Sequence, residues 1–209
     1  LHVAEAIAAS GIRPSLWLTG RSHLKPEVEQ RLKELEARGA TVHYRRIDVT
    51  SRDAVSDLLA EIDVIDGRLD GIFHGAGLTR DGLLVTKDEA RLHEVLAPKV
   101  TGTRILDEAL GNRPLDFLVL FASAAGALGN PGQSDYAAAN AFLDRFANLR
   151  NARVTAGTCH GRTIAIDWPY WRDGGMHMDA RTIEAMEREA GVRPLETAPA
   201  IASLTGILS

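Results

Sequence analysis

The stretch that most constrains the fold runs from Phe117 to Asn148, where an apolar run, a glycine-rich break and an alanine-rich run follow one another. The apolar run, residues 117–121, has the length of a buried strand. Glycines and Pro131 then interrupt the chain, and residues 136–148 favour a helix. Strand, irregular loop and helix in this order are typical of α/β proteins, in which ligands bind beyond the carboxyl ends of the strands.

Three polar residues of this stretch are candidates for chemistry. Ser123 follows the predicted strand directly, and Tyr136 and Asn140 are four residues apart, so they share one face of the predicted helix. A hydroxyl, a phenol and an amide that meet in one pocket can polarise a carbonyl group and give it a proton. From the residues alone, Tyr136 could instead be a core aromatic and Asn140 an amide bonded to the backbone. The three alanines between them favour open space.

Strand-like and helix-like segments alternate along the rest of the chain. The expected strands are residues 15–19, 41–47, 70–74, 117–121 and 162–167. The expected helices are about residues 1–10, 26–38, 51–62, 88–110, 136–148, 180–190 and 196–208. This alternation predicts an α/β, Rossmann-like fold with a doubly wound parallel sheet. With no internal repeat and no flexible linker, a single domain over residues 1–209 is expected.

Composition excludes several classes of function. The formal net charge of −4 does not indicate a nucleic-acid partner or an anionic membrane surface. No apolar run approaches the roughly 18 residues that span a bilayer, and the first residues lack the features of a signal peptide. Cys159 is the only cysteine, which fits a reducing, cytoplasmic location. The seven histidines show no metal-ligand spacing, so no metal is expected.

The front of the expected fold is missing from the sequence. A nucleotide-binding sheet of this kind opens with a strand and a glycine-rich turn before its first helix. No Gly-x-Gly-x-x-Gly pattern occurs, and Leu1 already lies in what should be that helix. We therefore expect the chain to be incomplete at its N-terminus, without the first strand and the glycine-rich loop.

The run FASAAG…GQ..YAAANAFLD resembles the ketoreductase domains of modular polyketide synthases, a branch of the short-chain dehydrogenase/reductases. The resemblance extends over essentially the whole chain. Most of that superfamily has Tyr-x-x-x-Lys, whereas here Asn140 stands four residues after Tyr136, as in the polyketide branch. The resemblance implies that Tyr136 donates a proton, Ser123 binds the carbonyl oxygen and Asn140 supports a proton path. It also assigns Lys99, otherwise an ordinary exposed lysine, to tuning Tyr136 and holding the cofactor's ribose.

The cofactor implied by the resemblance is NADPH. Gly20 and Arg21 end an expected strand at the place where an arginine favours the 2′-phosphate of NADP, although a solvated surface arginine is the alternative. For Asp48, with Val49, a contact to the adenine and a role in a turn are equally open. A second close approach of backbone to cofactor is expected after the next strand, at His74, Gly75, Ala76 and Gly77.

Stereocontrol is also implied by the resemblance. Asp81 occupies the last position of a degraded Leu-Asp-Asp motif, and Leu128 stands where the opposite stereochemical group has tryptophan. Both favour the B-type outcome, a D-configured hydroxyl, although Asp81 could merely cap a turn. Substrate contacts are further expected at Gln133, Trp168 and Met176. For Trp168, packing in the core is equally possible.

The predicted activity is therefore NADPH-dependent reduction of a β-ketoacyl thioester. Its partners would be an acyl carrier protein with a phosphopantetheine-bound chain and the neighbouring polyketide synthase domains. Two alternatives remain: a free-standing short-chain dehydrogenase acting on a small ketone, and a structural subdomain that reduces nothing. Asn140, which stands in place of the usual lysine, counts against the first alternative. The full set of catalytic residues counts against the second.

Overall fold

The computed structural model describes residues 1–176 and 178–208. Two compact units are present: Leu1–Arg46 together with Pro169–Ser209, and Ile47–Trp168. Each unit is described by itself below. The expectation of a single domain stays a prediction.

The second unit contains a parallel sheet with the strand order β3-β4-β5. The strands are β3 (Gly71–His74), β4 (Phe117–Ser123) and β5 (Arg162–Trp168). The central strand β4 is fully buried at Leu118, Val119 and Leu120. A continuous apolar run is what a parallel strand covered on both faces requires. The sequence therefore identified the central strand correctly.

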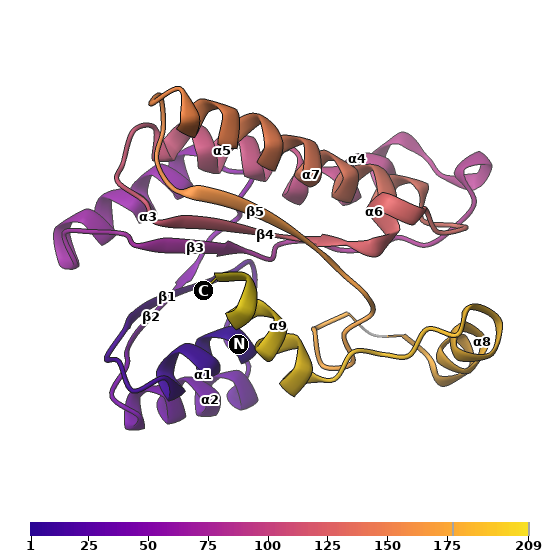
Figure 1. The fold of residues 1–209 in the computed structure, drawn as a ribbon, viewed down its shortest axis with the longest axis horizontal. Coiled ribbons are helices and arrows are strands. Elements are labelled where there is room, and N and C mark those ends of the chain that lie inside the picture. The colour runs from indigo at the N-terminus through magenta and orange to yellow at the C-terminus, as the bar shows by residue number, and fades with distance from the viewer. Residues whose placement is uncertain (177, 209) are drawn as a thin grey trace. The chain divides into compact units, whose positions relative to one another are not determined.

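Helices cover one face of this sheet, where Figure 1 shows α4, α5 and α7 side by side along the strands. The helices of the unit are α3 (Arg52–Ile65), α4 (Glu89–Lys99), α5 (Thr101–Leu110), α6 (Ala124–Leu128) and α7 (Ser134–Thr155), with a 3-10 turn η1 (Leu84–Thr86). Side-chain caps fix three of their starts, because Ser51, Asp88 and Ser123 accept hydrogen bonds at the starts of α3, α4 and α6.

Several local predictions differ from the structure, and α7 (Ser134–Thr155) is much longer than the helix expected over residues 136–148. The single helix expected over residues 88–110 is divided into α4 and α5 at Val100. Pro98 has no N–H to donate and its ring disfavours a straight helix, which accounts for a break close to it. Helix α6 and η1 were expected as loop, because both are too short to show helical periodicity.

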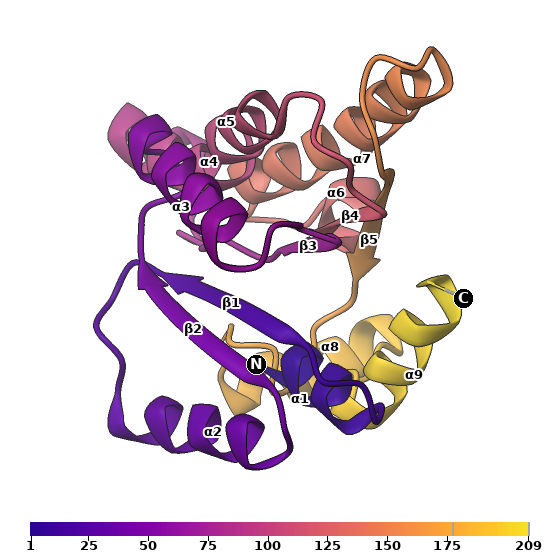
Figure 2. The ribbon, with the colours of Figure 1, turned by 90° about the vertical axis from the view of Figure 1, so that its left-hand side faces the viewer.

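The first unit contains a two-stranded parallel sheet of β1 (Ser15–Gly20) and β2 (Thr41–Arg46). Helices α1 (His2–Ala9) and α2 (Pro26–Ala37) lie beside these strands (Figure 2). Their common core consists of Ala4, Ala8, Leu32, Leu35 and Ala40. Helices α8 (Ala180–Ala190) and α9 (Thr197–Leu208) complete the unit.

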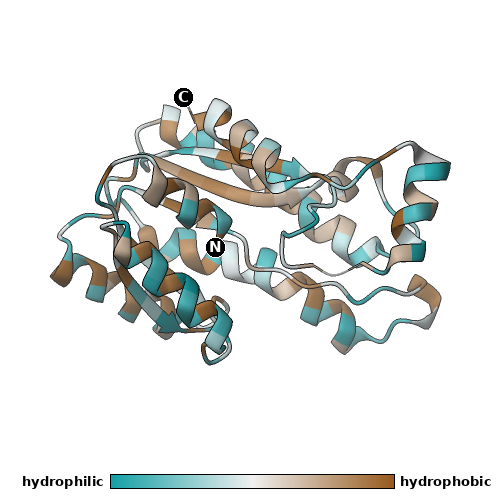
Figure 3. Cartoon of the chain, turned by 90° about the horizontal axis from the view of Figure 1, so that it is seen from below, coloured by the Kyte–Doolittle hydropathy of each residue, from teal (hydrophilic) through white to brown (hydrophobic). Residues whose placement is uncertain are grey.

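The parallel strands and the helices between them confirm the predicted Rossmann-like α/β fold. Helices carry both brown and teal residues, and long brown stretches run along only part of the strands (Figure 3). Within residues 1–176 and 178–208, no helix combines the length and the apolar character needed to cross a membrane.

Candidate active site

Ser123 lies at the carboxyl end of the central strand, where β4 gives way to α6. Its hydroxyl accepts a hydrogen bond from the Ala125 N–H at 3.3 Å and so caps the short helix. Its own N–H donates to the carboxylate of Asp167 on the neighbouring strand β5. Burial raises the pKa of Asp167, and the bond from Ser123 opposes that rise. Ser123 is thus held from both sides at the edge of the sheet where ligands bind in this fold class.

Tyr136 and Asn140 occupy the first turns of α7, and both are buried. The Asn140 amide nitrogen donates to the Tyr136 carbonyl oxygen at 2.7 Å. This bond matches the backbone-bonded amide that the sequence left open as an alternative. The side-chain oxygen of Asn140, Oδ1, however, has no hydrogen-bond partner in the described part of the chain. A buried acceptor left unsatisfied is costly, so this oxygen favours a donor supplied by water or ligand.

Gly126 brings the segment after Ser123 against the helix that carries Tyr136. A Cβ atom at Gly126 would lie 2.8 Å from the Ala141 backbone nitrogen and 3.0 Å from the Asn140 Cβ. Only glycine therefore permits α6 to approach α7 this closely. The sequence analysis assigned Gly126 no role, although a glycine inside a small-residue run is the signal that points to close packing.

Lys99 is buried, with 3% of its surface exposed, at the last residue of α4. Its ammonium group donates to the Phe121 carbonyl oxygen at 2.6 Å. Strand β3 ends at His74, opposite Leu120, so this carbonyl lies beyond the last residue paired with β3. Burial lowers the pKa of Lys99 to about 8. The alternative of an ordinary exposed lysine is therefore wrong.

The segment after β3 packs against the end of α4. The ring nitrogen Nε2 of buried His74 lies 3.2 Å from the Pro98 carbonyl oxygen. Burial, with the charge of Lys99 adding to it, lowers the pKa of His74 to about 4, so the ring is neutral at pH 7. A Cβ atom at Gly77 would lie 2.9 Å from the Lys99 Cε. The backbone at Gly77 thus passes close to the end of the Lys99 side chain, while exposed Gly75 and half-buried Ala76 lie between His74 and Gly77.

Asp48 and Val49 each make contacts that stabilise the local structure. The Asp48 carboxylate accepts hydrogen bonds from the Thr50 N–H at 2.9 Å and the Thr50 hydroxyl at 2.7 Å, as a turn aspartate does. A Cβ atom at Gly102 would lie 2.7 Å from Val49 Cγ1, so Val49 packs closely on α5. The turn role of Asp48 is present in the structure, and an adenine contact stays a prediction.

Two loops that flank the start of α7 are bonded to each other. The Gln133 side-chain amide donates to the Asp81 carboxylate at 3.0 Å, and the Gly82 N–H donates to the Gly132 carbonyl at 2.9 Å. Asp81 therefore bonds a side chain 52 residues further along the chain. Leu128 is 85% exposed. The structure thus brings together Asp81 and Gln133, two of the predicted stereocontrol residues.

The profile of the KR domain family matches residues 1–173. The chain belongs to the KR domain family. The polyketide synthase PksN of Bacillus subtilis (strain 168) is 44% identical over 201 residues, covering 96% of this chain and 4% of PksN. The polyketide synthase ThaG of Burkholderia thailandensis is 39% identical over 207 residues, covering 99% of this chain and 4% of ThaG.

A solved ketoreductase domain from the bacillaene assembly line matches this KR domain with a TM-score of 0.94 and 40% identity. The match covers 97% of this chain and 49% of that one. The chain thus spans about half of the solved ketoreductase and a small part of each synthase. The predicted family, ketoreductase domains of polyketide synthases, is confirmed.

The remaining predicted residues of the KR domain have different surroundings. Trp168, opposite Ser123 in the strand register, is buried, and its ring centroid lies 5.7 Å from that of Phe121. Trp168 therefore packs in the core, and a substrate contact at this residue stays a prediction. Gly20, Arg21 and Met176 belong to the unit Leu1–Arg46 with Pro169–Ser209. In that unit Arg21 is exposed directly after β1, and Met176 is 36% exposed.

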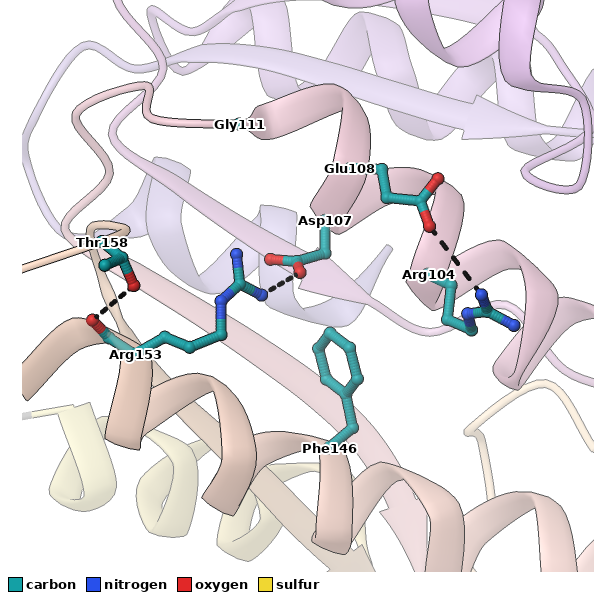
Figure 4. Close-up of a pocket in the computed structure, with 7 residues that line it drawn as sticks. All are labelled: Arg104, Asp107, Glu108, Gly111, Phe146, Arg153 and Thr158. Atoms are coloured by element: carbon teal, nitrogen blue, oxygen red, sulfur yellow. Dashed lines mark hydrogen bonds and ion pairs between the residues drawn. The ribbon is translucent and has the colours of Figure 1, made fainter. Parts of the chain in front are cut away.

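A separate pocket of about 370 Å³ lies between α5 and the carboxyl-terminal part of α7 in the KR domain (Figure 4). Its charged groups are already paired, since Arg153 bonds Asp107 at 2.6 Å and Arg104 lies 4.0 Å from Glu108. None of the predicted site residues lines it. The lining residues are Arg104, Asp107, Glu108, Gly111, Phe146, Arg153 and Thr158.

Proposed function

We propose that this KR domain uses NADPH to reduce a β-ketoacyl thioester, carried by an acyl carrier protein, to the β-hydroxyacyl thioester. The observation that supports it is the set of polar groups at and after the carboxyl end of β4, of which Lys99 and Tyr136 are buried and Ser123 is half-buried. Ser123 ends β4, the Lys99 ammonium bonds a β4 carbonyl two residues earlier, and Tyr136 begins the helix that follows. These are the groups that carbonyl reduction needs: an oxygen-binding donor, a proton donor and a buried cation.

The donor groups of the chain fit a phosphorylated nicotinamide dinucleotide. Arg21 is exposed at the carboxyl end of β1, and a guanidinium can bind a 2′-phosphate through two N–H groups. The Lys99 ammonium has three donors and uses one on the Phe121 carbonyl, which leaves two for ribose hydroxyls. When bound, NADPH supplies the hydride that the β-carbon receives.

The chain's own residues supply the proton. In the proposed reaction, the Ser123 hydroxyl donates a hydrogen bond to the carbonyl oxygen, and the Tyr136 phenol gives its proton to the same oxygen. In this proposal the positive charge of Lys99 stabilises the phenolate that Tyr136 becomes. With a pKa of about 8, Lys99 is mostly charged at pH 7. The unpartnered Asn140 oxygen can order the water through which Tyr136 regains its proton.

The choice of NADPH over NADH depends on Arg21. In the Arg21→Ala variant, the KM for NADPH should rise far more than the KM for NADH, because only NADPH carries the 2′-phosphate. Steady-state kinetics with both cofactors measures this. Equal changes in both constants would rule out a contact between Arg21 and the phosphate.

We propose the B-type outcome, a D-configured hydroxyl, from Asp81 and from the leucine at position 128. The bond between Asp81 and Gln133 supports a substrate-guiding role for this loop, because it holds Asp81 near the start of α7. Chiral analysis of the reduced thioester measures the outcome. A predominantly L-hydroxy product would refute the B-type assignment.

The partners proposed are the acyl carrier protein that presents the thioester and the other domains of a polyketide synthase. The synthase relatives are long proteins of which this chain matches 4%, which supports action within a multidomain enzyme. The cytoplasm is the proposed location, supported by a single buried cysteine, Cys159.

The deciding experiment uses the protein expressed with all of its native flanking sequence. NADPH oxidation is followed at 340 nm with a simple β-ketoacyl thioester, and the product is identified by mass. Stoichiometric NADPH oxidation with a product two mass units heavier is expected. Folded, NADPH-binding protein without turnover would favour a domain that does not reduce its substrate. Turnover of small free ketones in preference to thioesters would favour a free-standing dehydrogenase.

A further inference from the structure

A buried ion pair links the loop after β3 to the helix that carries Tyr136. Lys87 directly follows η1, and Asp135 is the second residue of α7. The Lys87 ammonium bonds the Asp135 Oδ1, and their side chains are only 3% and 1% exposed. The two residues are 48 positions apart. The pair therefore closes a long loop at a point adjacent to Tyr136.

The same Asp135 oxygen also holds the backbone of Tyr136. Oδ1 accepts the Tyr136 N–H at 2.9 Å, in addition to its bond with Lys87. The second oxygen, Oδ2, is buried and has no hydrogen-bond partner among the described residues. A buried carboxylate needs a paired charge to offset its desolvation. Lys87 is the cation that offsets it, so the desolvation of Asp135 is compensated only while the loop holds Lys87 in place.

Two more bonds connect the same segments. They are the bond from the Gly82 N–H to the Gly132 carbonyl and the bond from the Gln133 amide to Asp81. Gly132 has a φ angle of +79°, a conformation that strongly favours glycine. The segment 81–87 is thus bonded to residues 132–135 at both of its ends.

We propose that Lys87 and Asp135 are positioning residues: their buried pair fixes the first turn of α7, and with it Tyr136, relative to the loop at Asp81. The proposal rests on the proposed reductase function. Stability alone does not explain the pair, because apolar residues of similar volume commonly replace a buried ion pair without loss of stability. A role in positioning Tyr136 does explain the pair, since a displacement of about 1 Å at a catalytic group can cost on the order of a hundredfold in rate.

The test is a double-mutant cycle in the protein with all of its native flanking sequence. Lys87→Met leaves a buried carboxylate unpaired and should lower both the melting temperature and kcat. The double variant Lys87→Met/Asp135→Asn removes both charges of the pair, and the introduced amide can still accept the Tyr136 N–H. It should regain most of the lost melting temperature. Its kcat should stay at least about tenfold below wild type, with KM values for thioester and NADPH within about threefold.

A matched control is the ion pair between Arg68 and Asp116, which also spans 48 residues but is exposed. Its double variant Arg68→Met/Asp116→Asn should keep kcat within about twofold of wild type, as expected for surface pairs. A control that loses as much kcat as the Lys87/Asp135 double variant would overturn the proposal. So would a stable Lys87/Asp135 double variant with wild-type kcat and product configuration.

A second variant covers the case in which the double variant fails to fold. Asp135→Glu keeps both charges and moves the carboxylate by one methylene group. It should fold, bind NADPH with wild-type affinity and lose about tenfold or more in kcat. Wild-type kcat in this variant would overturn the proposal. Absence of turnover in the wild-type protein would instead refute the proposed function, so the two failures are distinguishable.

Discussion

The unit Ile47–Trp168 buries charged groups at both ends of its sheet. The two ends differ in how completely these groups are hydrogen-bonded. At the amino end of β5, the guanidinium of Arg150 is 1% exposed and bonds the Asp107 carboxylate at 2.7 Å. It also bonds three oxygens around the start of that strand: the carbonyls of His160 and Gly161 and the hydroxyl of Thr163. Each nitrogen of this guanidinium therefore has a partner.

The carboxyl end leaves its buried polar groups incompletely bonded. Lys99 bonds one carbonyl, and no carboxylate lies within ion-pair distance of it in the described part of the chain. Asn140 Oδ1 and Asp135 Oδ2 likewise have no hydrogen-bond partner among described residues. Fully bonded networks rigidify a core, whereas unsatisfied buried groups cost stability and need a functional reason. The amino end is therefore fully hydrogen-bonded, whereas the carboxyl end holds the groups that the proposed reaction would use.

The largest effect should come from removing the proposed proton donor at the carboxyl end, Tyr136. Tyr136→Phe deletes one hydroxyl and should lower kcat by about 10²- to 10⁴-fold, the usual contribution of general acid catalysis. The affinity for NADPH, measured by fluorescence titration, should stay unchanged. A kcat within tenfold of wild type, about 1.4 kcal/mol in the barrier, would refute the assignment of Tyr136.

At the amino end, the expected effect is on stability. Arg150→Met should lower the free energy of unfolding by about 3–5 kcal/mol, because Asp107 loses its most buried partner. Urea denaturation measures this, and kcat of the protein that remains folded should not change. Arg145→Met on the exposed face of the same helix is the control and should stay within about 0.5 kcal/mol. A larger effect on kcat than on stability would break the contrast between the two ends.

Much of the carboxyl end could be predicted from sequence because its signals are local. The apolar run of β4, the position of Ser123 and the four-residue spacing of Tyr136 and Asn140 are all readable within one stretch. Strands β1 and β2 were likewise expected within one residue of their observed bounds. The periodicity of short apolar runs suffices for such elements.

The pairs that fix the two ends could not be predicted, since they join residues far apart in sequence. Arg150 and Asp107 are 43 residues apart, and each has the character of an exposed helical charge when it is considered by itself. Lys99 was assigned to the site only through the family resemblance. Its burial depends on how α4 meets β4, which composition and spacing do not encode.

The charge of Lys99 gives a pH test of the carboxyl end. Its pKa is about 8 in the folded protein and has an ordinary value of 10.5 when exposed, so between these values the unfolded chain binds more protons. The free energy of unfolding should therefore rise with pH between about 8 and 10.5, by up to about 3 kcal/mol. Lys99→Met should lack this rise. Urea titrations of both proteins measure the difference, and parallel curves would show that Lys99 is not desolvated.

The smallest effect concerns Gly126, which lets α6 approach the helix that carries Tyr136. In Gly126→Ala the new methyl group would lie 2.8 Å from the Ala141 backbone nitrogen, so α6 must shift away from Asn140. Overpacking of this kind costs about 1–3 kcal/mol in the free energy of unfolding. Gly206→Ala is the matched control, because nothing lies within 4 Å of its Cβ position in α9. The control should stabilise its helix by up to about 1 kcal/mol. If Gly126→Ala also proved stabilising, the close contact between α6 and α7 would not exist in solution, and the carboxyl end would lose the contact that fixes Ser123 relative to Asn140.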